Sequence, residues 1–105
     1  MKSDIRDIQN EVVAWRSARG WEKHHTLTKL SHSLMVEAAE LGRHFLWNKE
    51  QEGYTQTQKK EIADELADVL YHVLIMSHEM DIDIAQAMHN KLEKSAKKYP
   101  VKKQV

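Results

Sequence analysis

The hydrophobic positions of this chain recur every three or four residues in four separate stretches, which is the spacing of amphipathic helices. The first stretch follows Ser3, a candidate N-cap, and stops at Gly20. The second is expected over about residues 27–47, with Thr26 as its cap. The apolar faces of these two segments consist of Ile5, Ile8, Val12, Trp15, Leu30, Leu34, Ala38, Leu41 and Phe45.

The third and fourth stretches follow the same spacing. The third helix is expected over about residues 57–80 and is the longest. The fourth begins at Asp83, and Gln86 stands three residues later, which resembles a capping box. It ends before Pro100, because proline disfavours a helical residue in front of it. The expected apolar positions here are Ile62, Leu66, Val69, Val73, Met76, Ile84, Ala87, Met88 and Leu92.

Three glycines and one proline among 105 residues leave few places for turns, which favours helices over many short strands. We therefore predict an all-α fold, an antiparallel four-helix bundle. The chain is long enough for one domain, expected at residues 1–100, and residues 101–105 are expected to be a disordered tail.

Charge and cysteine content narrow the function classes. Sixteen basic and sixteen acidic residues cancel, so no overall field draws the chain to a nucleic acid polymer or a membrane. The absence of cysteine excludes disulfides, thiolate metal sites and cysteine nucleophiles. No apolar run is long enough to span a bilayer, and the first residues are too charged for a signal peptide. We therefore expect a cytoplasmic protein that binds its ligand at a local site.

Four acidic residues stand beside the apolar faces rather than opposite them. Glu37 and Glu40 flank the face of the second helix, and Glu65 and Asp68 flank that of the third. Carboxylates gathered between helices need a compensating cation, and oxygen ligands favour Mg²⁺, with Mn²⁺ as a substitute. Such pairs also occur on solvated helix faces. A di-iron site would require Glu-x-x-His on two helices, which this chain does not offer.

The segment Val36-Glu37-Ala38-Ala39-Glu40-Leu41, followed by Glu65-Leu66-Ala67-Asp68-Val69-Leu70, resembles the Glu-x-x-Glu and Glu-x-x-Asp signature of the MazG-like all-α pyrophosphohydrolases. The motif Arg19-Gly20-Trp21-Glu22 and the ending Lys98-Tyr99-Pro100 look most like the dCTP pyrophosphatase branch. The resemblance implies hydrolysis of a nucleoside triphosphate to a monophosphate and pyrophosphate. It also implies that all four acids bind Mg²⁺ and that one glutamate, Glu40 or Glu37, is catalytic as the proton acceptor for water.

The same resemblance implies a set of substrate-binding residues. Trp21 and Trp47 match aromatics that line the base pocket, and each could instead be a packing anchor at a helix end. Lys91 matches a lysine that contacts phosphate. The remaining candidates, each with a structural alternative, are His25, His72, Ser95, Lys98 and Tyr99.

Departures from the family pattern fall at three positions. Val36 replaces a glutamate that many MazG-like proteins carry, Ser95 replaces a common asparagine, and His72 replaces a tyrosine of the dCTP pyrophosphatase branch. We expect an enzyme with dCTP-like substrates that acts as a homo-oligomer, a dimer or a tetramer. The alternative is an inactive nucleotide-binding or oligomerisation module on the same fold.

Overall fold

The computed structural model describes residues 4–47 and 52–102. These residues form helices and no strand, which confirms the all-α class. None of the described helices is long and apolar enough to cross a membrane. In chain order the main elements are α1 (Ile5–Ala18), the 3-10 helix η1 (Trp21–His24), α2 (Leu27–Arg43), α3 (Gln56–Glu79) and α4 (Ile84–Lys98).

The first two helices begin and end at residues that satisfy their terminal backbone groups. Asp4 caps α1, since its carboxylate accepts a hydrogen bond from the Asp7 N–H at 2.8 Å, whereas Ser3 lies outside the described residues. Gly20 follows the end of α1 with a left-handed φ of 65°, as a helix stop requires. The Thr26 hydroxyl accepts from the Lys29 N–H at 3.1 Å, which confirms the expected cap of α2.

Helix α2 ends at Arg43, four residues before the expected Trp47. The expectation relied on Phe45, which continues the apolar spacing of the helix. In the structure Phe45 lies beyond the helix and packs its ring edge-on to Tyr54, with 5.7 Å between centroids. A contact across the connection to α3 has therefore replaced continuation of the helix.

The expected capping box of α4 is only half formed. The Asp83 carboxylate accepts from the Gln86 N–H at 3.0 Å, but the Gln86 side chain donates to Asn90 instead of returning to the cap. A complete capping box occurs at α3, where Thr55 and Gln58 each bond the other's backbone N–H.

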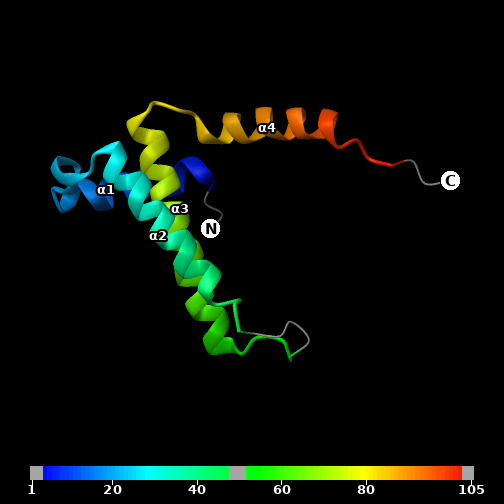
Figure 1. Ribbon diagram of the computed structural model, residues 1–105. Coiled ribbons are helices and arrows are strands. Elements are labelled where there is room, and N and C mark those ends of the chain that lie inside the picture. The colour runs from blue at the N-terminus through cyan, green and yellow to red at the C-terminus, as the bar shows by residue number, and fades with distance from the viewer. Residues whose placement is uncertain (1–3, 48–51, 103–105) are drawn as a thin grey trace.

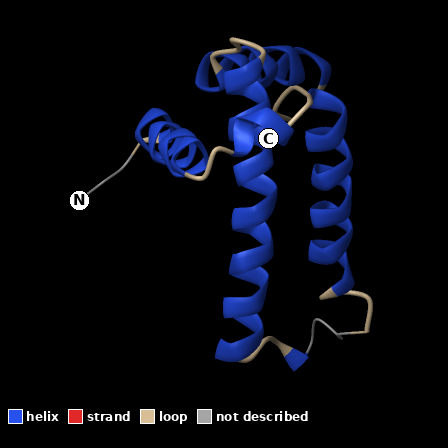
Figure 2. Cartoon of the chain, turned by 90° about the vertical axis from the view of Figure 1, so that its left-hand side faces the viewer, coloured by secondary structure: helices blue, strands red, loops and turns tan. Residues whose placement is uncertain are grey.

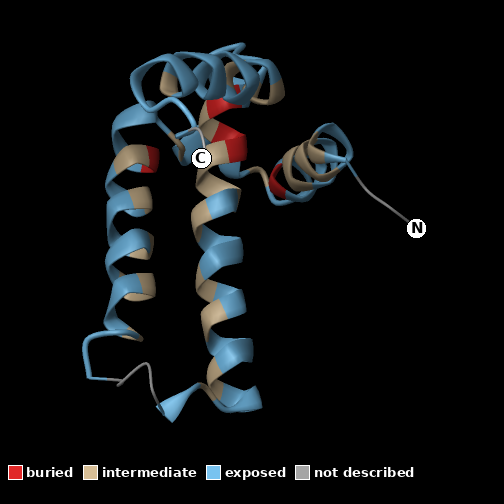
Figure 3. Ribbon diagram, turned by 90° about the vertical axis from the view of Figure 1, so that its right-hand side faces the viewer, coloured by how far each residue is buried: buried red, intermediate tan, exposed pale blue. Residues whose placement is uncertain are grey.

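Helices α2 and α3 lie side by side in opposite directions and form the long arm of the molecule (Figures 1 and 2). Helix α1 packs on α3 near the end of this hairpin where α2 begins. The buried side chains Leu30, Leu74 and Ile75 gather at that end (Figure 3). Gln9 fixes α1 there by donating to the Leu74 carbonyl at 2.9 Å. The core thus occupies one end of the hairpin.

Helix α4 projects away from the hairpin (Figure 1) and has no extensive contact with the other described helices. A four-helix bundle is therefore not closed within one chain. The radius of gyration is 17.1 Å, whereas a compact domain of this length has about 13 Å. The α4 apolar face, consisting of Ile84, Ala87, Met88 and Leu92, is consequently left largely uncovered by the described part of the chain. Ile84 borders a cavity with Ile5 and Gln9 of α1, whereas Met88 and Leu92 are exposed.

Candidate metal centre and adjoining cavity

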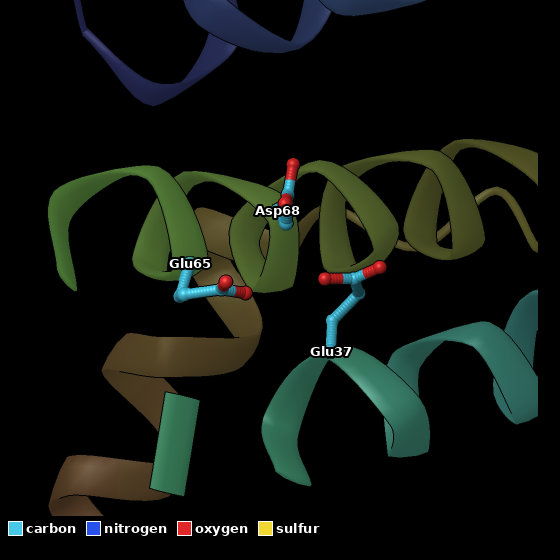
Figure 4. A group of neighbouring side chains, drawn as sticks. All are labelled: Glu37, Glu65 and Asp68. Atoms are coloured by element: carbon cyan, nitrogen blue, oxygen red, sulfur yellow. The ribbon is translucent and has the colours of Figure 1, made fainter. Parts of the chain in front are cut away.

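Three carboxylates meet across the seam between α2 and α3. Glu37 from α2 and Glu65 and Asp68 from α3 each place a carboxylate oxygen within 4.8 Å of the others (Figure 4). Burial, followed by repulsion from Asp68 and Glu65, raises the pKa of Glu37 above its ordinary value. One oxygen of Glu65, Oε2, is buried without a hydrogen-bond partner.

These observations fit a divalent cation. Carboxylates that repel one another and an unsatisfied buried oxygen are compensated by a positive charge, and hard oxygen donors suit Mg²⁺ or Mn²⁺. Sequence spacing placed Glu65 closest to the apolar face among the acids of α3, and its side chain is 22% exposed. Glu37, Glu65 and Asp68 are therefore the residues that would hold such an ion.

The fourth expected acid, Glu40, is not part of this group. Its Oε2 atom lies 3.3 Å from Nη1 of Arg43, one helical turn further along α2. The next residue, His44, places Nε2 at 3.8 Å from Oε1 of Glu65. Two basic side chains at the end of α2 thus approach the acids from one side.

On the other side the acids adjoin an aromatic cavity of about 380 Å³. Asp68 belongs both to the acid group and to the wall of this cavity. Trp15 stands edge-on to Trp21 at 5.0 Å and to Tyr71 at 6.1 Å between ring centroids. The cavity is lined by Trp15, Trp21, His24, His25, Lys29, Leu30, Ser33, Asp68, Tyr71 and His72.

Two polar atoms in the wall of this cavity have no partner. They are Nδ1 of His25 and the hydroxyl of Tyr71, and both are buried. Burial, with a further contribution from the nearby Arg16, lowers the pKa of His25 and keeps its ring neutral at pH 7. Burial raises the pKa of Tyr71, so its hydroxyl stays protonated. A wall of aromatic rings with a few unpaired polar groups is typical of a site for a flat, polar ligand.

The structure brings together some of the expected substrate residues. Trp21, His25 and His72 line the aromatic cavity. Trp47 does not join them, because it is 92% exposed and lines a separate cavity at the far end of α2. The candidates on α4 and directly after it lie apart from the acids within this chain, because α4 stands away from the hairpin (Figure 1). They are Lys91, Ser95, Lys98 and Tyr99.

Several cavity and site residues were not singled out from the sequence. Trp15 was assigned to the core face of α1, and Tyr71 carried no signal beside the acids. Arg16 is buried and paired with Glu79. Its position one turn after Val12, on the apolar face of α1, was the available signal. Arg43, which pairs with Glu40, and the cavity residues His24, Lys29 and Ser33 were also not singled out.

Comparison with known proteins gives the family and relatives of the same fold. The model of the MazG-like family matches residues 32–105, which include Glu37, Glu40, Glu65 and Asp68. A crystal structure of a pyrophosphatase from Archaeoglobus fulgidus superimposes with a TM-score of 0.83 at 31% sequence identity, over 96% of each chain.

Curated relatives match almost the whole of this chain but only part of their own length. The dCTP pyrophosphatase 1 proteins of rat and mouse are 32% and 29% identical to this chain over 102 residues, or 93% of its length. The chain spans 58% of the length of these relatives.

Proposed function

This chain belongs to the MazG-like family, and we propose that it is a Mg²⁺-dependent nucleoside triphosphate pyrophosphohydrolase. The observation that carries the proposal is the group of three carboxylates directly beside an aromatic cavity, with Asp68 common to both. The acids suit a metal-bound polyphosphate, and the aromatic rings suit a nucleobase. The names of the curated relatives make dCTP-like compounds the first substrates to test.

The reaction breaks the bond between the α-phosphorus and the oxygen that bridges to the β-phosphate. The oxygen of a water molecule bonds to the α-phosphorus, and the bridging oxygen leaves with its electron pair as part of pyrophosphate. A bound Mg²⁺ supplies neutralisation of the phosphate charge and activation of water. Glu37, Glu65 and Asp68 would hold this ion.

Glu40 is our candidate for accepting the proton of the attacking water. Glu40 lies one turn from Glu37 on α2 yet outside the group of three acids, so it is the acid least involved in holding the ion. A carboxylate that does not ligate a divalent cation is a better proton acceptor than one that does. Glu37 is the alternative acceptor.

We also propose that the active form is a homo-oligomer. The chain exposes 9041 Å², whereas a compact monomer of 12.3 kDa exposes about 6,100 Å². The excess of about 3,000 Å² is larger than the roughly 800 Å² that one partner contributes to a standard interface. The exposed part of the α4 apolar face, Met88 and Leu92, belongs to this excess, and a second copy of the chain is its proposed partner. A cytoplasmic location stays a prediction from the sequence.

Release of pyrophosphate from a panel of nucleoside triphosphates tests the proposed reaction. Wild type, Glu65→Gln and the control Glu93→Gln are compared with Mg²⁺ and with a chelator. Glu93 is exposed and lies on α4, apart from the acid group, so its loss of charge should leave the rate unchanged. We expect metal-dependent release that Glu65→Gln abolishes. Absence of release from every substrate would favour the inactive nucleotide-binding or oligomerisation module.

A further inference from the structure

The two ends of the acid group differ in chemistry, which gives the site a direction. At one end is the aromatic cavity, which contains Asp68. At the other end a second cavity of about 290 Å³ is lined by Arg43, His44, Trp47, Glu52 and Gln58. The first is mainly apolar and is lined by the rings of Trp15, Trp21 and Tyr71, whereas the second presents charged and amide groups.

Both cavities are bordered by residues of α2, so the rise of the helix per residue gives the distance between them. Ser33 borders the aromatic cavity and Arg43 borders the second. At 1.5 Å per residue the two positions are separated by about 15 Å of helix. An extended nucleoside triphosphate covers such a span from its base to its last phosphate, and the acids at Glu37 and Glu65 lie between the two ends.

We propose that Arg43 binds the β- and γ-phosphates, which are the part of the nucleotide that leaves as pyrophosphate. This inference rests on the proposed function. The base then occupies the aromatic cavity and the α-phosphate lies at the acid group. Arg43 suits the role because its guanidinium presents several donors in a plane that matches phosphate oxygens. Its side chain is 71% exposed, so it is free to turn toward a ligand.

Binding of the phosphates by Arg43 would break the ion pair between Arg43 and Glu40. In the structure these two side chains neutralise each other at 3.3 Å. A polyphosphate carries more negative charge than one carboxylate and competes for the guanidinium. Arrival of the β- and γ-phosphates thus draws Arg43 away and leaves Glu40 unpaired beside the water that it is proposed to deprotonate.

The reverse orientation, with the base near Trp47, is less consistent with the side chains. Trp47 is 92% exposed and has no ring contact within the described residues. In contrast, Trp21 is held between Trp15 and His25 by edge-on ring contacts. A fixed ring can stack a base at a lower entropic cost than a free one.

Titration calorimetry in Mg²⁺ buffer tests the inference without depending on turnover. The ligands are inorganic pyrophosphate and dCMP, and the proteins are wild type, Arg43→Ala, Arg43→Lys and the control Lys60→Ala. Lys60 is exposed and lies on the side of α3 away from the seam. We expect Arg43→Ala to weaken pyrophosphate binding at least about tenfold, the scale of one charge-assisted hydrogen bond. Binding of dCMP should change less than about twofold, because that ligand does not reach Arg43.

Two further readouts separate this role from structural damage. The Mg²⁺ affinity of Arg43→Ala without pyrophosphate should not fall, since the substitution removes a positive charge near the acids. Arg43→Lys should recover part of the pyrophosphate affinity. Unchanged pyrophosphate binding in Arg43→Ala, an equal loss for both ligands, a loss for dCMP alone, or no pyrophosphate binding by wild type would overturn the inference. Hydrolysis by wild type, assayed separately, decides the proposed function itself.

Discussion

Replacement of Leu92 by alanine is expected to weaken self-association. Leu92 lies in the α4 apolar face and has 58% of its surface still exposed in the single chain. Full burial of a leucine side chain contributes about 1.5–3 kcal/mol, so the part left to bury on association is worth about 1–2 kcal/mol per chain. In a two-fold symmetric dimer the contribution counts twice. The dissociation constant should therefore rise roughly 30- to 700-fold.

Sedimentation equilibrium over a range of protein concentrations measures this change. Glu93→Ala is the matched control, because Glu93 is the next residue and lies on the opposite side of α4 from the apolar face. Circular dichroism verifies that both variants remain helical. The reasoning is refuted by a monomeric wild type, or by a dissociation constant that Leu92→Ala leaves as it was.

Three other substitutions test the core, the acids and the cavity. Leu74→Ala, at a fully buried position, should lower the free energy of unfolding by about 2–5 kcal/mol in denaturant titrations. With chelator present and at a pH above the ordinary carboxyl pKa, Glu37→Gln should have a higher Tm than wild type. The reason is that the fold raises the pKa of Glu37, so the folded state loses stability when this group ionises. This difference in Tm between Glu37→Gln and wild type should vanish at lower pH, where Glu37 is protonated. A difference that stays constant with pH would contradict the raised pKa of Glu37. Trp21→Ala should raise KM about 5- to 150-fold through lost stacking; an unchanged KM would place the base elsewhere.

Local signals in the sequence predicted the helices because they act within a few residues. Thr26 and Asp83 cap their helices as expected, since a cap needs only its own side chain and the N–H three residues later. The end of α2 was misplaced because Phe45 makes its contact with Tyr54, across a connection that helical spacing does not describe. The sequence likewise did not predict that α4 stands away from the hairpin. Periodicity identifies an apolar face but not whether its partner belongs to the same chain.

The sequence predicted part of the candidate site, namely the acids at the seam between α2 and α3. Helical angles placed Glu37 and Glu65 at the seam, where the structure brings their carboxylates together. They did not predict that Arg43 would pair with Glu40, because an exposed pair at this spacing depends on rotamers. They also missed Tyr71, which reaches the aromatic cavity from a face that sequence spacing alone does not mark as part of a site.

The position of bond cleavage tests the central claim most directly. Wild type is incubated with dCTP and Mg²⁺ in water enriched in ¹⁸O, and the products are separated and analysed by mass spectrometry. Attack at the α-phosphorus predicts one ¹⁸O atom in the nucleoside monophosphate and none in pyrophosphate. Label in pyrophosphate, or formation of a nucleoside diphosphate and orthophosphate, would contradict the account.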